Sequence, residues 1–198
     1  MYKTHNRRTR IYALASPENV ANTVTMVSAS IMQPWYSVGR QLQDIQEWGE
    51  DATCLNWGIK KACYKYVQEN KRDIFLTLHE YKSGEIDLPD LLIRLCEIPG
   101  IQLVKAGFIA QLTLGKVGCL DIHNLRMYGI NASTFKFTDK TTYATKRKKA
   151  ELYIATCERL GGSEYLWDVW CENLAECHPT KFTSKHHVSR VHCDYLGA

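Results

Sequence analysis

The feature that most constrains the fold is a helical spacing of apolar residues, interrupted by proline and glycine. Between Pro17 and Trp48 apolar side chains recur every three or four residues, which is the period of an α-helix. Ser16 before Pro17 is typical of a helix start, and Pro34 predicts a break between two helices. No convincing alternation of polar and apolar residues indicates a strand. The sequence therefore predicts an all-α protein.

Further helices are expected downstream, because residues that begin or end helices bound several apolar segments. The expected ranges are 56–68 with 74–81 extending or following it, a helix through 91–96 capped by Asp87 or Asp90, then 104–114, 122–128, 144–160 and 165–177. Residues 1–12 are basic and polar and are expected to form a flexible arm or a first edge element. No internal repeat or linker is found, so the 198 residues are expected to form a single domain.

Composition excludes several classes of protein. Hydrophobic residues make up 45% of the chain and charged residues 23%, which is near the globular average. We expect neither a membrane span nor a secretory signal, because no long apolar stretch is present and none follows the basic N-terminus. Eight cysteines without an export signal are expected to be reduced thiols in an intracellular, cytoplasmic protein. The net charge of +4 is compatible with a polyanionic partner.

A turn at Pro99-Gly100 gives the first indication of function. It follows a helix that ends near Cys96 and precedes one that begins near Val104. A corner of this kind leaves backbone N–H groups unpaired at the positive end of the second helix. Such a corner binds phosphate, although a Pro-Gly pair also occurs in ordinary connections between helices.

Lys105 and Asp121 supply candidate catalytic groups. Lys105 lies one helical turn past the hairpin, and Asp121 follows 16 residues later (121 minus 105) at an expected helix start. A carboxylate stabilises the positive charge that develops on a deoxyribose as its base leaves, and an amine can attack the sugar carbon. Asp121 also suits the role of a helix N-cap, and the two roles can coexist. Lys105 is expected to be a nucleophile, a phosphate contact or a solvated side chain.

Two short segments resemble one family of DNA enzymes. Ile98-Pro99-Gly100-Ile101, together with Leu120-Asp121-Ile122-His123 and Arg126, resembles the helix-hairpin-helix DNA glycosylase superfamily, the endonuclease III-like enzymes. The family hairpin is typically Leu-Pro-Gly-Val-Gly, and its catalytic aspartate stands in a Val-Asp-Thr-His-x-x-Arg setting. The resemblance covers about residues 88–130 and implies a helical fold with a cleft between two helical lobes. It also implies a DNA glycosylase, with AP-lyase activity if Lys105 is the nucleophile, that acts on a damaged or modified base flipped out of the stack.

The chain departs from the family pattern at three places. Gln102 replaces the second hairpin glycine, and Lys105 lies one position later than the usual lysine. The four-cysteine iron–sulfur loop is missing, since Cys157, Cys171, Cys177 and Cys193 are separated by 14, 6 and 16 residues (171 minus 157, 177 minus 171, 193 minus 177). We therefore expect no iron–sulfur cluster, and neither zinc nor another cofactor is expected.

The expected site has a catalytic part and a DNA-binding part. The catalytic residues are Asp121 and Lys105. The DNA contacts are expected from Pro99, Gly100, Ile101, Gln102, Val104, His123, Asn124 and Arg126, and from the basic residues Lys146 and Arg147. Trp35, Tyr36, Trp57 and Tyr128 are candidates for the base pocket or a wedge, whereas Trp167 and Trp170 are assigned to the core.

Two alternative functions remain open. Some phage enzymes that remodel thymine-derived bases in DNA resemble the same superfamily, which suggests a base-hypermodification enzyme in the cytoplasm of an infected host. The other alternative is a DNA-binding helix-hairpin-helix module without catalysis. An enzyme requires Lys105 and Asp121 to face a common pocket, whereas a binding module does not. DNA is the expected partner in each case, and a monomer is favoured.

Overall fold

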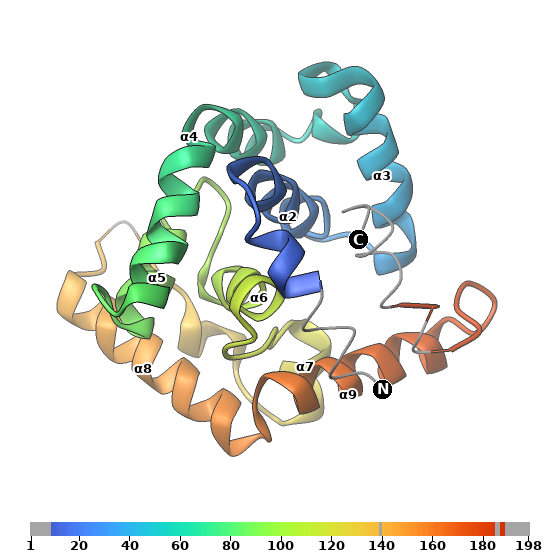
Figure 1. Ribbon diagram of the computed structural model, residues 1–198. Helices are drawn as coiled ribbons and strands as arrows, with labels where there is room; N and C mark the ends of the chain where they lie inside the picture. Colours follow the sequence, from blue (N-terminus) through green and yellow to red (C-terminus); the bar gives the residue numbers. More distant parts are fainter. Residues whose placement is uncertain (1–8, 139, 185–186, 189–198) are drawn as a thin grey trace.

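The computed structural model describes residues 9–138, 140–184 and 187–188 (Figure 1). These residues form α-helices and short 3₁₀ helices and contain no strand, so the all-α prediction is confirmed. The elements are α2 (Pro17–Ala29), α3 (Trp35–Trp48), η1 (Gly49–Asp51), η2 (Thr53–Leu55), α4 (Gly58–Ser83), α5 (Leu88–Leu95), α6 (Leu103–Leu114), α7 (Ile122–Met127), η3 (Ala132–Phe135), α8 (Tyr143–Arg159) and α9 (Gly162–Cys177).

A helical turn over residues 9–13 precedes α2. Thr9 and Ala13 of this turn are buried. Residues 9–12 of the segment expected to form a flexible arm or a first edge element are thus helical, with Thr9 buried and Ile11 and Tyr12 exposed. Residues 1–8 of that arm lie outside the described residues.

Local sequence signals explain where most helices begin and end. The Ser16 hydroxyl caps α2 by accepting a hydrogen bond from the Asn19 backbone N–H at 3.2 Å. Asp87 caps α5 in the same way, with the Asp90 N–H at 3.0 Å. Gly115 ends α6 in the left-handed conformation, with φ at +66°, which glycine adopts without steric cost. These features agree with the helix boundaries that the sequence predicts.

Helix α4 runs through a region where the sequence predicts either one helix or two. It is continuous but kinked at Asn70, whose φ of −113° and ψ of 16° are not helical. The Asn70 side chain donates to the Tyr66 carbonyl at 2.8 Å. The side chain thus satisfies a backbone acceptor at the kink.

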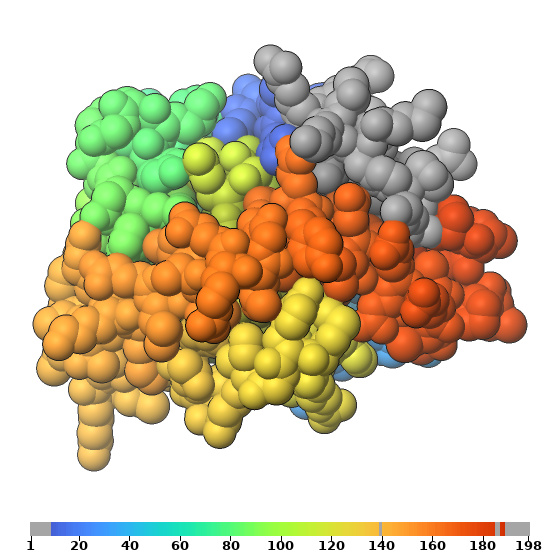
Figure 2. Space-filling view, turned by 90° about the horizontal axis from the view of Figure 1, so that it is seen from below, coloured from blue at the N-terminus to red at the C-terminus, as the bar shows by residue number. Residues whose placement is uncertain are grey.

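Helix α6 lies in the middle of the molecule (Figure 1). Nine of its 12 residues are buried: Leu103, Ala106, Gly107, Phe108, Ile109, Ala110, Gln111, Leu112 and Thr113. Helices α2 and α5 pack directly against it. Helices α8 and α9 cross the face seen in Figure 2, beside the segment that contains α7. A helix buried on nearly all sides holds its neighbours in fixed positions, since each of them buries apolar surface against it.

Gly107 leaves room on α6 for the ring of Tyr153 from α8. A Cβ at this position would lie 2.6 Å from both Cε1 and Oη of Tyr153, a residue of α8 that is itself fully buried. Among the described helices, none is both long and apolar enough to cross a lipid bilayer.

Replacing Gly107 by alanine is expected to destabilise the protein. The added methyl group must displace the Tyr153 ring, so we expect a loss of about 1–3 kcal/mol in the free energy of unfolding, which is typical of overpacking. Urea denaturation followed by circular dichroism measures this change. Gly58→Ala is the control, because Gly58 begins α4 and no atom lies within 4 Å of an added Cβ. Equal stability of the Gly107→Ala variant and the wild-type protein would contradict the packing described here.

Candidate active site

The hairpin between α5 and α6 is a tight turn anchored by apolar side chains. The Ile101 N–H donates to the Ile98 carbonyl at 3.0 Å, and Gly100 has a φ of +79°. Ile98 and Ile101 are buried in the core, whereas Pro99 and Gly100 are partly exposed. Ile101 thus anchors the turn from inside and does not lie on its outer surface, where a DNA contact was expected.

Gln102 follows the hairpin at the N-cap position of α6, and its side chain does not cap the helix. Instead its Oε1 accepts a hydrogen bond from the Phe137 N–H at 3.1 Å. In the first turn of α6 the Lys105 N–H donates to the Gln102 carbonyl at 2.8 Å, whereas the N–H groups of Leu103 and Val104 have no acceptor one turn earlier in the helix. The hairpin therefore has the backbone donors that suit an anion.

Asp121 caps α7 and receives three hydrogen bonds. Its Oδ1 accepts from the backbone N–H groups of His123 and Asn124, each at 3.0 Å. Its Oδ2 accepts from Nε1 of Trp170 at 2.8 Å. The N-cap role that the sequence predicts for Asp121 is confirmed, and the carboxylate is also partly exposed. The contact with Trp170 has no signal in the sequence, because the two residues are 49 positions apart.

The segment that leads to Asp121 is fixed by buried polar side chains. The Tyr153 hydroxyl donates to the Gly118 carbonyl at 2.5 Å and accepts from the Leu120 N–H at 3.2 Å. Burial raises the pKa of Tyr153 well above its ordinary value, so the hydroxyl stays protonated and remains a donor. Gln111 of α6 accepts from the Cys119 N–H at 3.0 Å. These contacts place Asp121 relative to α6 and α8.

Lys105 lies in the first turn of α6 and points toward the end of α2. Its Nζ donates to Oγ of Ser30 at 2.9 Å and lies 5.6 Å from the centre of the Phe108 ring. Ser30 is the C-cap residue of α2, where the negative end of the helix dipole favours a cation. The amine is partly exposed and forms no ion pair with Asp121.

A second lysine binds the same end of α2, and the sequence gives no signal of it. Lys60 is only 2% exposed, and its Nζ donates to the Ala29 carbonyl at 2.8 Å and to Oε1 of Gln41 at 3.3 Å. Burial lowers the pKa of Lys60, and repulsion from Lys105 acts in the same direction. Lys60 joins α4 to α2 and α3 from inside the protein.

Lys105 and Asp121 line one cavity of about 600 Å³. The described residues around it include the aromatic side chains of Trp35, Phe108 and Trp170 and the polar side chains of Ser30, Gln33, His123 and His178. The aromatic walls pack against one another, with ring centres 4.8 Å apart for Trp35 and Trp170 and 5.6 Å apart for Phe108 and Trp170. The cavity thus combines an apolar aromatic surface with one amine and one carboxylate.

The other expected site residues differ in accessibility. His123 is exposed and Val104 is partly exposed, and both line the cavity. Asn124 is fully buried, and its Nδ2 donates to the Cys119 carbonyl at 2.6 Å, so it supports the turn rather than reaching a ligand. Arg126 is exposed on α7 but is not among the residues that line the cavity.

The two basic residues expected to bind phosphate have different environments. Arg147 is bound to Asp87, to Asp90 at 2.7 Å and to Glu151 at 3.2 Å. Lys146 carries no such ion pair among the described residues and lies 5.8 Å from the centre of the Phe137 ring. Of the two, Lys146 is therefore the one whose charge is available to an anion.

The expected aromatic residues also differ in their surroundings. Trp35 is buried and forms a wall of the cavity, while Tyr36 and Trp57 are exposed. Tyr128 is partly exposed. Trp167 and Trp170 are buried, as expected of core residues, but Trp170 also lines the cavity and binds Asp121.

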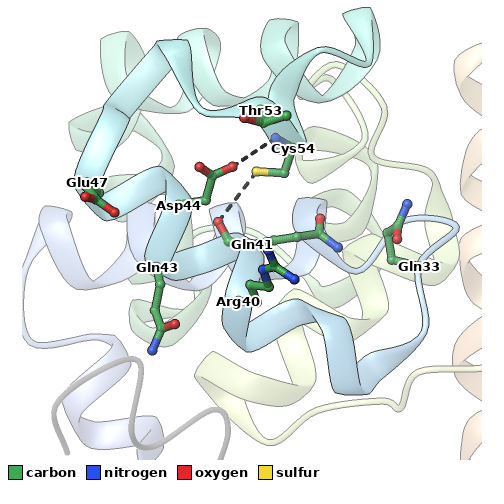
Figure 3. A pocket seen from close by; sticks show the side chains of 8 residues that line it. All are labelled: Gln33, Arg40, Gln41, Gln43, Asp44, Glu47, Thr53 and Cys54. Atoms are coloured by element: carbon green, nitrogen blue, oxygen red, sulfur yellow. Dashed lines mark hydrogen bonds between the residues drawn. The ribbon is translucent and has the colours of Figure 1, made fainter.

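A second hollow of about 630 Å³ is polar and lies beside α3 (Figure 3). Asp44 accepts from the Cys54 N–H there at 3.0 Å, and Gln33 lines both this hollow and the Lys105–Asp121 cavity. Burial, followed by the charge of Asp44, raises the pKa of Cys54 to about 11, so its thiol is not ionised at neutral pH. This hollow therefore presents no activated nucleophile.

No group of three or more His, Cys, Asp or Glu side chains suited to a metal ion occurs within the described residues. His186, His192 and Cys193 lie outside them. Comparisons with protein-family models, with curated proteins and with solved structures each found no match to the chain.

Cys119 lines the cavity, and its reactivity tests whether it could act as the nucleophile. Burial raises its pKa from 9.0 to about 12, so we expect iodoacetamide to alkylate it slowly in the folded protein up to about pH 10. In urea, where Cys119 is exposed, the rate of alkylation should instead rise as the pH passes the ordinary pKa of a cysteine thiol. Mass spectrometry of peptides measures both rates, with the exposed Cys177 as the control. Rapid alkylation of Cys119 in the folded protein at pH 8 would contradict this environment.

Proposed function

We propose that the protein is a DNA glycosylase of the helix-hairpin-helix type, which removes a damaged or modified base that has been flipped out of the stack. The observation that carries the proposal is that Lys105 and Asp121 line the same cavity, although they lie on different helices. A binding module needs no such convergence. The helical lobes with a cleft between them, as in the endonuclease III-like enzymes, are part of this proposal.

The aromatic walls of the cavity suit a base. A base that leaves the duplex loses its stacking partners, and aromatic side chains replace them. Trp35, Phe108 and Trp170 line the cavity, each at most 5% exposed, and the polar groups of Gln33 and His178 lie in the same cavity. This aromatic lining with polar groups beside it supports the proposal that the cavity takes a base.

In the proposed reaction the bond between the base and C1′ of the deoxyribose breaks, and the bonding electrons leave with the base. The carboxylate of Asp121 stabilises the positive charge that develops on the sugar. If water attacks C1′, Asp121 accepts its proton and an abasic sugar results. If the unprotonated amine of Lys105 attacks, it forms a covalent bond to C1′ as the bond to the base breaks, and the nitrogen loses a proton. The C1′–O4′ bond then opens, O4′ takes up a proton, and a Schiff base forms between the nitrogen and C1′, from which strand cleavage can follow.

The hairpin supplies the proposed grip on DNA. The backbone donors at the start of α6 suit one phosphate group, and they lie in the same turn of the chain as Lys105. Lys146 adds a charge beside Phe137, whose N–H is bound by Gln102 of the hairpin segment. The proposed phosphate contacts and the cavity thus lie close together in the chain, since Gln102 and Lys105 are three residues apart.

Borohydride trapping on a panel of oligonucleotides with damaged and modified bases tests the reaction. We expect base release by the wild-type protein and its loss in Asp121→Asn, with DNA affinity retained. A covalent adduct that disappears in Lys105→Ala indicates attack by the amine, and base release without an adduct indicates attack by water. DNA binding without release from any substrate would overturn the glycosylase and favour a binding module. Exchange or addition of a group on the base, without its release, would instead indicate a base-modifying enzyme.

The salt dependence of DNA binding tests the proposed phosphate contacts. Lys146→Gln is expected to weaken binding and to reduce the slope of log K against log salt by about 1, because one fewer counterion is released. Arg147→Gln is the matched control on the same helix. Since Arg147 is bound to carboxylates, its loss should lower thermal stability and leave the slope unchanged. Equal slopes for the wild-type protein and Lys146→Gln would remove Lys146 from the interface.

A further inference from the structure

We infer that Trp170 is a positioning residue, whose indole N–H fixes the orientation of the Asp121 carboxylate toward the cavity. The inference rests on the proposed function in one respect, which is that Asp121 is the group that acts on the substrate. The contact itself is the 2.8 Å hydrogen bond from Nε1 of Trp170 to Oδ2 of Asp121. Trp170 is 5% exposed and lies on α9, whereas Asp121 precedes α7.

Capping of α7 does not account for this hydrogen bond. The cap needs only Oδ1, which accepts from the N–H groups of His123 and Asn124. Turning about the Cβ–Cγ bond moves both oxygens together, so a donor on Oδ2 adds a restraint on that rotation to the one that the cap supplies through Oδ1. The indole N–H binds this second oxygen, so both oxygens have defined places. A catalytic group held in one orientation needs no rearrangement when charge develops on the substrate.

The indole is itself held rigidly. It packs edge-on against Trp35, with an angle of 77° between the rings, and against Phe108, with an angle of 62°. Trp35 is fixed in turn by a 3.3 Å hydrogen bond from its Nε1 to the Val188 carbonyl. The N–H of Trp170 therefore cannot turn away from Asp121 without disturbing the aromatic walls. The same side chain forms part of the cavity surface and orients the acid within it.

Trp167 provides a comparison within the same cluster. Its ring centre lies 5.3 Å from that of Trp170, and it is also buried. Its Nε1 has no hydrogen-bond partner among the described residues. Replacing either tryptophan by phenylalanine removes an indole N–H and similar volume from one cluster. Only the Trp170 variant also removes a donor to Asp121, so Trp167→Phe is a matched control.

Kinetics separate positioning from packing. In Trp170→Phe we expect single-turnover base release to fall about 10- to 100-fold, the size expected for losing one hydrogen bond to an ionised group. DNA affinity should stay within about twofold, because the phosphate contacts are untouched. Trp167→Phe should lose less than about threefold in rate, since its N–H binds nothing. Equal losses in the two variants, or no loss in Trp170→Phe, would overturn the inference.

Nuclear magnetic resonance tests the hydrogen bond without any activity. In protein labelled with ¹⁵N-tryptophan, Asp121→Asn should move the Nε1–H signal of Trp170 upfield and leave that of Trp167 in place, because an amide oxygen is a weaker acceptor than a carboxylate. Trp170→Phe assigns the signal, and the four remaining indole signals report whether the fold is kept. An unchanged Trp170 signal in Asp121→Asn would overturn the inference. If the wild-type protein releases no base, the proposed function fails, and this measurement alone decides whether Trp170 holds the carboxylate.

Discussion

The contact between Gly107 of α6 and the Tyr153 ring of α8 is the constraint on which the rest of the structure depends. Gly107 leaves room for the ring of Tyr153, and the Tyr153 hydroxyl then binds the backbone on both sides of Cys119. That contact fixes the segment from which Asp121 extends. The N-terminus of the same α6 follows the hairpin and carries Lys105. One buried helix thus sets the positions of the turn, the amine and the acid.

The two charged groups of the cavity are each bound at a helix end rather than by each other. The Lys105 amine binds the Ser30 hydroxyl at the C-terminal end of α2, and Asp121 binds N–H groups at the N-terminal end of α7. Each helix end presents partial charge of the sign opposite to that of the side chain beside it. The amine and the carboxylate are therefore held near one cavity without forming an ion pair, which leaves both of them able to contact a third group. Aromatic and aliphatic side chains form most of the remaining wall.

The helical content and most helix ends could be predicted from the sequence because they depend on local signals. Ser16, Asp87 and Gly115 act on residues within one turn of themselves, and the structure places them at helix ends as predicted. Asp121 is similar, since its capping role follows from its neighbours. The turn over residues 9–13 was missed because Thr9 and Ala13 are buried by distant parts of the chain. The sequence also could not decide between one helix and two at Asn70, where the helix bends without ending.

Contacts between distant residues could not be predicted from one sequence. Arg147 and Lys146 are adjacent in the chain, yet only Arg147 reaches the carboxylates of α5. Lys60 gives no sign in the sequence that it is buried against the end of α2. Spacing along the helix assigned Trp170 to the core, and its ring is indeed buried. Spacing gave no sign that the indole N–H binds Asp121. In each case the packing of the helices determines which group the side chain binds. The spacing of residues along one helix carries no information about how helices pack.

The position of Tyr153 and Trp170 in the chain has a consequence for the order of assembly. The hairpin, Lys105 and Asp121 leave the ribosome before α8 and α9, which hold the turn and the carboxylate. A nascent chain that ends before Trp170 has the chemical groups of the cavity but lacks the donor on Oδ2. Translation therefore supplies the donor to the acid only after the hairpin, the amine and the acid have been made.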